Sequence, residues 1–407
     1  MRTLRWFQVR WFWELGVFLV CGLAVGCGGS SSHTDTTATS ATTPTGQNVA
    51  PISVNSGPNG NYADAAFASV TVCIPGTSTC HTIDDVLVDT GSFGLRILSS
   101  QLPLSLPQQN SSAGDPVAEC LPFLATYTWG PVQGADVEIA GEKASSVPIQ
   151  VINNTFAVPN GCSDLGLSPA NSVQTLGANG ILGIGLYAQD CGPACTQTGS
   201  SNPGLYYGCP SSGCQVIAEP LAQQVQNPVA LFATDNNGVV IELPAVSSPE
   251  PTLSGSLIFG IGTESNNALG TAKIYVPDDY GNFTATYKGV PYPTSFIDSG
   301  SNAYFFLDQS TTGIPDCTNQ TGFYCPDGTQ SVTATTEGTN GVSGTVSFSV
   351  ANANALFANG SDFVFNDLGG PGPNSFDFGL PFFLGRDVFV AIDNKSTPGG
   401  SGPYWAY

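Results

Sequence analysis

The feature that most constrains this chain is an internal repeat. Residues Val86–Ser92 (VLVDTGS) resemble residues Ser295–Ser301 (SFIDSGS), because each is an apolar stretch that runs into Asp, a small hydroxyl residue, Gly and Ser. A second pair of segments, Ile181–Gly183 and Phe383–Gly385, follows the first in the same order and at similar spacing. Two elements that recur in one order are typical of duplicated units. We therefore expect two lobes of common ancestry.

Each copy of the repeat places a carboxyl, Asp89 or Asp298, at the mouth of a tight turn. Gly91 and Gly300 tolerate backbone conformations that a side chain forbids, and they let two such loops approach closely. If a pseudo-two-fold axis relates the copies, the carboxyls lie side by side and share a proton, since two adjacent carboxylates cannot both ionise cheaply. Such a pair offers an acid and a base at one point, suited to activating water. The alternative is that each Asp simply caps a turn.

Composition narrows the fold and the chemistry. The chain has 49 Gly and 30 Pro among its 407 residues, which favours short strands joined by tight turns and an all-β fold. Its formal charge of -21 leaves too few cations for a nucleic-acid-binding face. With two His, a Ser-His-Asp triad or a catalytic zinc site is not expected, and we expect neither a metal nor another cofactor.

Alternating apolar residues predict strands, and one segment has a helical spacing. The alternating sets are Val70, Val72 and Ile74; Ala135, Val137 and Ile139; Val147, Ile149 and Val151; and Val346, Phe348 and Val350. Ile217, Leu221 and Val225 recur at every fourth position, which predicts a short helix.

The N-terminus carries an export signal. Three Arg precede an apolar run over residues 11–25, and small residues precede Cys27, as in the lipobox of a bacterial lipoprotein. We expect residues 1–26 to be a lipoprotein signal peptide, Cys27 to be lipidated, and residues 27–50 to form a Ser/Thr/Gly-rich tether. The protein would then be anchored to the membrane of the cell envelope through its lipid; ordinary secretion after cleavage is the alternative.

Ten further cysteines support export, because an even number in an oxidising compartment indicates up to five disulfides. Short loops would be closed by Cys73 with Cys80 and by Cys317 with Cys325, and a longer loop by Cys120 with Cys162. The remaining four can pair in three ways or bind a metal: Cys191, Cys195, Cys209 and Cys214.

Taken together, these motifs resemble those of the pepsin-like aspartic proteases. Residues 179–185 (NGILGIG) are similar to the Asp-Gly-Ile-Leu-Gly stretch of that family, and residues 255–260 (GSLIFG) are similar to the strand near its lobe junction. Residues 127–130 (YTWG), followed by an alternating strand, look like its flap hairpin. The matches span roughly residues 60–393.

The resemblance implies a bilobal all-β fold, with an N-terminal lobe over residues 51–235, a C-terminal lobe over residues 236–407, and a cleft between them. It implies an endopeptidase in which Asp89 and Asp298 activate water, without a covalent intermediate. The residues that would support the dyad are Thr90, Gly91, Ser92, Ser299, Gly300 and Ser301. Tyr127 and Trp129 would act in the flap or, alternatively, pack on a strand face. Arg96 stands where the family keeps a Trp beneath the flap.

The expected substrate is a peptide or an unfolded protein, bound to a monomer. A second hypothesis keeps the fold as a catalytically inactive peptide- or envelope-binding lipoprotein. A third is glycoside hydrolysis, in which paired carboxyls stand roughly 5 to 9.5 Å apart and do not touch.

Overall fold

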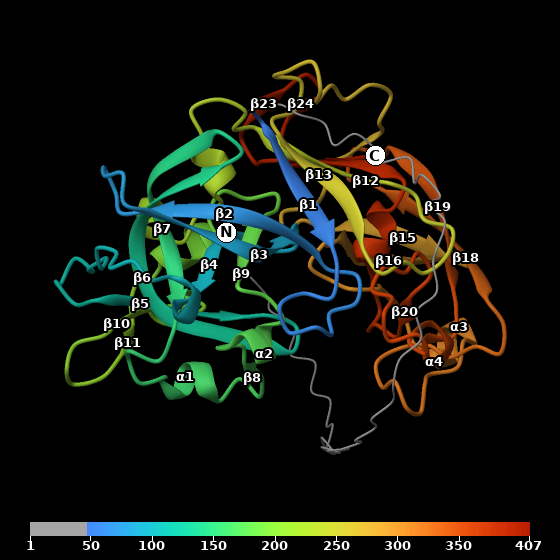
Figure 1. The fold of residues 1–407 in the computed structure, drawn as a ribbon, viewed down its shortest axis with the longest axis horizontal. Helices are drawn as coiled ribbons and strands as arrows, with labels where there is room; N and C mark the ends of the chain where they lie inside the picture. The colour runs from blue at the N-terminus through green and yellow to red at the C-terminus, as the bar shows by residue number, and fades with distance from the viewer. Residues whose placement is uncertain (1–46) are drawn as a thin grey trace, which may run out of the picture.

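The computed structural model describes residues 47–407, and it confirms the predicted bilobal all-β fold (Figure 1). The signal peptide, Cys27 and most of the predicted tether lie outside the described residues. The predicted tether, residues 27–50, extends two residues into β1 (Val49–Val54), which begins at Val49. Val49 and Ala50 are buried and pair with Ile258 and Leu257, so they belong to a sheet.

The N-terminal half forms the first lobe, drawn from blue to green in Figure 1. Its strands are β2 (Ala66–Cys73), β3 (Cys80–Asp89), β4 (Phe93–Leu98), β5 (Val117–Pro122), β6 (Thr126–Ile139), β7 (Glu142–Ile152), β8 (Ser168–Pro169), β9 (Gly180–Ile184), β10 (Tyr206–Gly208) and β11 (Gln215–Val216). Two one-turn helices accompany them, α1 (Asn160–Ser163) and α2 (Val173–Leu176). The alternating sets predicted here lie on β2, β6 and β7.

The second lobe is built on a seven-stranded sheet in the order β19-β18-β15-β16-β21-β17-β20. Its strands are β15 (Phe283–Tyr287), β16 (Val290–Ile297), β17 (Tyr304–Phe306), β18 (Gln330–Glu337), β19 (Ser343–Val350), β20 (Gly369–Gly370) and β21 (Phe376–Phe378), with helices α3 (Gln309–Thr312) and α4 (Ala353–Leu356). Aromatic rings fill its interior; those of Phe306 and Phe376 stack with centroids 5.2 Å apart. Each fully buried Phe contributes about 1.5 to 3 kcal/mol of hydrophobic stabilisation.

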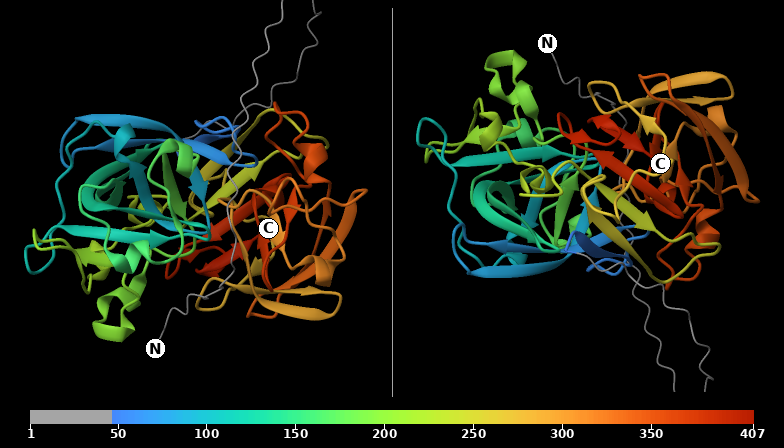
Figure 2. Two further views of the ribbon diagram at one scale, coloured as in Figure 1. Left: turned by 90° about the horizontal axis from the view of Figure 1, so that it is seen from below. Right: turned by 90° about the horizontal axis from the view of Figure 1, so that it is seen from above.

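A further set of strands joins the lobes. The first-lobe sheet continues through β1 into β13 (Leu253–Phe259), β12 (Gly238–Leu243), β22 (Arg386–Ala391), β25 (Tyr404–Ala406) and β14 (Ile274–Tyr275). A small hairpin, β23 (Ser396–Thr397) with β24 (Gly400–Ser401), lies apart from this sheet. Both views of Figure 2 show these junction strands between the two lobes. Because β1 pairs with β13 along its whole length, segments some 200 residues apart hold the lobes together.

The helix predicted from Ile217, Leu221 and Val225 is wrong. That segment is extended apart from one 3-10 turn at Leu221–Gln223. The side chain of Gln224 bonds to both backbone groups of Gly192, at 2.7 and 2.9 Å, so tertiary contacts override the spacing. None of the helices within residues 47–407 is long and apolar enough to cross a membrane.

Residues 47–407 contain five disulfides, and these confirm the three pairs predicted from spacing. The other four cysteines pair with their nearest neighbours, Cys191 with Cys195 and Cys209 with Cys214. This pairing leaves no thiolate of that segment to bind a metal. Five disulfides are typical of an exported, non-cytoplasmic protein.

Candidate active site

The two Asp residues of the repeat lie at the ends of equivalent strands. Asp89 is the last residue of β3, which pairs in parallel with β9, so that Asp89 is in register with Gly183. Asp298 follows β16, which pairs in parallel with β21, and its backbone N–H donates to the carbonyl of Phe378 at 3.1 Å. Both carboxyls therefore leave the carboxyl end of a strand at the junction of the lobes.

Reciprocal hydrogen bonds lock the two loops together. The backbone N–H of Thr90 donates to Ser299 Oγ at 3.1 Å, and the backbone N–H of Ser299 donates to Thr90 Oγ1 at 2.9 Å. The Ser299 hydroxyl in turn donates to the carbonyl of Val88 at 2.7 Å. Both hydroxyl residues are buried, so these bonds are shielded from water.

Each carboxyl receives the same two donors from its own loop. Asp89 accepts from the backbone N–H of Gly91 at 2.8 Å and from the Ser92 hydroxyl. Asp298 accepts from the backbone N–H of Gly300 at 2.8 Å and from the Ser301 hydroxyl at 3.0 Å. The structure thus brings together the dyad and all six of the residues predicted to support it.

The glycines permit the close approach of the loops. A Cβ added to Gly91 would lie 2.5 Å from Asp298 Cγ. A Cβ added to Gly300 would lie 2.7 Å from Asp89 Oδ1 and 3.1 Å from Asp298 Oδ1, which shows that both carboxyls border one small space. This geometry opposes the glycosidase hypothesis, which needs carboxyls spread across a sugar.

The two carboxyls are electrostatically coupled. Burial raises the pKa of Asp298 well above its ordinary value, and so do the charges of Asp89 and Asp377 and a hydrogen bond with Asp89. Two carboxyls this close share one proton, so the raised pKa of Asp298 is a property of the pair. Burial and the charges of Asp89 and Asp298 also raise the pKa of the Tyr62 phenol.

The second element of the repeat was assigned to the wrong segment. Strand register makes Asp377–Gly379 the counterpart of Ile181–Gly183, because Phe296 pairs with Asp377 as Leu87 pairs with Ile181. The predicted segment, Phe383–Gly385, instead leads into β22. Asp377 interrupts the apolar pattern, which is why sequence comparison missed both the counterpart and a third carboxyl beside the dyad.

Comparison with known proteins places the chain in a family. A family model described as a protein of unknown function, DUF3443, matches residues 44–407. The chain belongs to the DUF3443 family. No curated protein sequence matches it. Among solved structures, the DUF3443 protein resembles the aspartic proteinase from Irpex lacteus, with a TM-score of 0.50 and 16% identity over 88% of this chain and 96% of that chain. This likeness shows that the fold is pepsin-like.

The β5–β6 hairpin, which carries the predicted flap residues, buries both of their aromatic side chains. The hairpin turns at Phe123–Thr126, where the backbone N–H of Phe123 donates to the carbonyl of Thr126, and Leu124 at its tip is 85% exposed. Tyr127 and Trp129 follow the turn on β6 and are buried. The Trp129 ring packs edge-on against Tyr207, in a cluster that includes the Cys120–Cys162 disulfide. This packing agrees with the alternative prediction, in which Tyr127 and Trp129 lie on a strand face.

Neighbouring strands hold this hairpin on both sides. β10 pairs with β5 through Tyr206 and Glu119, and β8 pairs with β6 through Ser168 and Thr126. The Cys120–Cys162 disulfide further ties β5 to α1. The hairpin therefore forms the centre of a small sheet, and its neighbouring strands restrict its movement.

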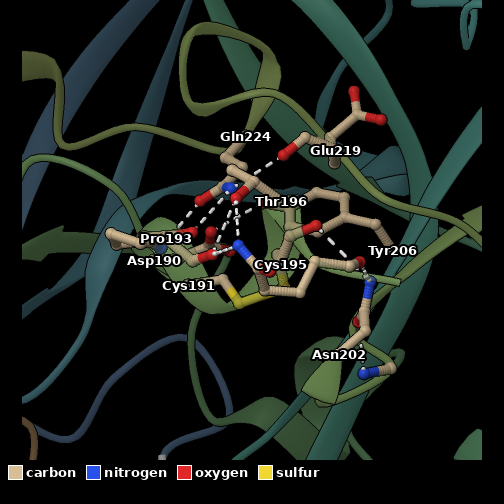
Figure 3. The surroundings of a disulfide bond; sticks show 12 residues. Asp190, Cys191, Pro193, Cys195, Thr196, Asn202, Tyr206, Glu219 and Gln224 are labelled. Carbon is tan, nitrogen blue, oxygen red and sulfur yellow. Dashed lines mark hydrogen bonds between the residues drawn. A yellow bond between two sulfur atoms is a disulfide. The ribbon is translucent and has the colours of Figure 1, made fainter. Parts of the chain in front are cut away.

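A buried charge cluster lies between the hairpin and the Cys191–Cys195 loop. Arg96 donates to Glu119 at 2.7 Å and to Asp190 at 2.9 Å, and all three side chains are almost fully buried. The Tyr206 hydroxyl donates to Asp190 at 2.6 Å, and Figure 3 shows these two residues beside the disulfide. Burial and the charge of Glu119 raise the pKa of Asp190 well above its ordinary value, against the effect of Arg96. One cation thus connects the hairpin to the four-cysteine segment.

Proposed function

We propose that the DUF3443 protein is an aspartic endopeptidase of the bacterial cell envelope. The observation that carries the proposal is the Asp89–Asp298 pair, interlocked through Thr90 and Ser299 on a pepsin-like fold. Its substrate would be an extended peptide or an unfolded protein segment laid between the lobes. No other group is needed for the reaction.

The chemistry follows from one proton shared by the two carboxyls. The ionised carboxyl of the pair takes a proton from a water held between Asp89 and Asp298, and the water oxygen attacks the peptide carbonyl carbon. The protonated carboxyl donates its proton to the carbonyl oxygen, which gives a tetrahedral diol. Collapse of the diol breaks the C–N bond as the protonated carboxyl gives its proton to the departing nitrogen. The other carboxylate takes a proton from a diol hydroxyl, so the dyad again holds one proton, as at the start.

The test is cleavage of an unfolded protein by the purified protein over a range of pH, with and without a statine-type transition-state mimic. Acid-dependent cleavage that the mimic blocks and that Asp298→Asn abolishes would support the proposal. A folded, fully oxidised preparation that cleaves nothing across the range would contradict it.

A peptide-binding module without turnover is the second candidate. It is favoured by the burial of Tyr127 and Trp129, because neither predicted flap side chain then stands at the hairpin tip, where Phe123–Ala125 lie. It predicts saturable binding of peptides and of the mimic, with no product even after long incubation.

We further propose that a lipid on Cys27 anchors a monomer to the membrane. Replacement of Cys27 by Ser should move the protein from the membrane fraction to the soluble fraction, and sedimentation of the soluble form should give the mass of one chain. Membrane attachment that survives Cys27→Ser would contradict the lipid anchor.

A further inference from the structure

Asp377 is a third carboxyl at the dyad, and it breaks the symmetry of the lobes. In the first lobe the equivalent position is held by Ile181, a buried apolar residue. Asp377 is also buried, at 6% exposure, on the short central strand β21. The reaction described above gives it no role.

The hydrogen bonds of Ser301 require a proton on one of its two carboxyl partners. Ser301 Oγ lies 2.6 Å from Asp377 Oδ2 and 3.0 Å from Asp298 Oδ2. A hydroxyl donates one hydrogen, whereas ionised carboxylates only accept. Both contacts are therefore hydrogen bonds only if one of the two carboxyls donates to Ser301. In the first lobe, Ser92 donates to Asp89.

The surroundings favour Asp377 as that donor. Its Oδ1 is buried and has no hydrogen-bond partner among the described residues, which is costly for a charged carboxylate and less so for a neutral carboxyl. Burial raises the pKa of Asp377 to about 8; the bond from Ser301 opposes this shift and the charge of Asp89 adds to it.

Other titratable groups come to this region on the elements packed against β21. They include the carboxyls of Asp89 and Asp298, the phenol of Tyr304 on β17, and the phenols of Tyr287 and Tyr292, whose rings pack against Phe376. The guanidinium of Arg386, on β22, lies near Tyr304. Arg386 lies over the ring of Phe382 and donates to the carbonyl of that residue. The cation is thus engaged elsewhere, and the pKa of Asp377 takes its electrostatic contribution from Asp89.

We propose that Asp377 is a positioning residue that carries its own proton and donates it to Ser301, so that the Ser301 hydroxyl is aimed at Asp298. When Asp377 ionises, it competes with Asp298 for the single Ser301 hydrogen and adds a like charge beside the dyad. The catalytic consequence rests on the proposed function, whereas the hydrogen-bonded chain does not.

The first test reads the proton directly and needs no activity. The infrared spectrum of the whole protein at neutral pH should contain a neutral-carboxyl C=O band that Asp377→Asn removes and that exposed Asp387→Asn retains. In the wild-type protein, the band should fade as the pH rises past about 8. A neutral-pH spectrum unchanged by Asp377→Asn would overturn the proposal.

The second test asks whether Asp377 acts through Ser301. Asp377→Leu should lower kcat/KM about tenfold, and it should have little further effect in a Ser301→Ala background. Asp377→Asn, whose amide donates at every pH, should retain more activity than Asp377→Leu. Equal losses with and without Ser301 would overturn the proposal and indicate a packing role. If the wild-type protein cleaves nothing, this result counts against the proposed function. The infrared spectra then test the proton on Asp377 independently of activity.

Discussion

Thr90 and Ser299, 209 residues apart in the sequence, each donate a backbone N–H to the side-chain oxygen of the other. The two bonds cross between loops that belong to different lobes. They fix the position of Asp89 relative to Asp298, because each Asp directly precedes one of the partners.

Removal of one hydroxyl from this pair should destabilise the fold. Thr90→Val keeps the shape of the side chain but leaves the buried N–H of Ser299 unpaired, which should cost about 1 to 3 kcal/mol in the free energy of unfolding. Urea denaturation measures the loss. The same substitution at exposed Thr333 should change the unfolding free energy by less than about 0.5 kcal/mol; equal effects at the two sites would contradict the interlock.

Loss of either dyad carboxyl should abolish cleavage without unfolding the protein. Asp89→Asn and Asp298→Asn each remove a group that transfers a proton, so the rate should fall by at least about a hundredfold. Product formation from an unfolded protein substrate measures the effect, with Asp387→Asn as the exposed control. Residual cleavage near the wild-type rate in either variant would refute the assignment of the dyad.

The dyad should make stability depend on pH. The pKa of Asp298 is raised in the folded protein, so its contribution is fully present below the ordinary pKa of Asp, about 4, and is lost as the pH rises toward the folded value. The Tm should therefore fall as the pH rises, and Asp298→Asn should flatten that fall. Thermal melts at several pH values provide the measurement; parallel curves for the two proteins would argue against a raised pKa.

The buried cation Arg96 should matter far more than an exposed one. Arg96→Met leaves the carboxyls of Glu119 and Asp190 buried without their cation and should cost about 3 to 5 kcal/mol. Lys143 also bridges two carboxyls, but its side chain is 43% exposed and its ion pairs are screened by water, so Lys143→Met should lower the unfolding free energy far less than Arg96→Met does. Denaturant titration of both variants checks the contrast, and similar losses would contradict it.

Disulfide removal should follow loop length. Cys120 and Cys162 are 42 residues apart, whereas Cys209 and Cys214 are 5 apart. In the loop-entropy model, removal of the first pair by Ser substitution should cost about 2 kcal/mol more than removal of the second. Unfolding free energies of the two double variants test this order, and the reverse order would show that native packing dominates.

Much of the fold could be predicted because its signals are local. Alternation of Val, Ile and Ala over β2, β6 and β7 reflects strands with one buried face, and such a period can be recognised in a short stretch of sequence. The Asp-Thr/Ser-Gly-Ser turns can be recognised in the same way, since the conformation of each turn depends on its own residues. These turns were enough to predict which residues of the two lobes meet around Asp89 and Asp298.

Where the prediction failed, distant segments decided the outcome. Ile217–Val225 has a helical spacing, yet the contacts of Gln224 with Gly192 hold it extended. Tyr127 and Trp129 were placed in the flap by their order in the chain, but burial against Tyr207 and the Cys120–Cys162 disulfide determines which way they face.

The sequence by itself determined the all-β class, the duplicated Asp turns and three disulfides, because each depends on residues close together in the chain or on a count. The tertiary structure alone decided that Cys191 pairs with Cys195, that Asp377–Gly379 is the counterpart of Ile181–Gly183, and that a third carboxyl meets the dyad. Strand register and side-chain burial are set by packing between segments that the chain brings together only when it folds.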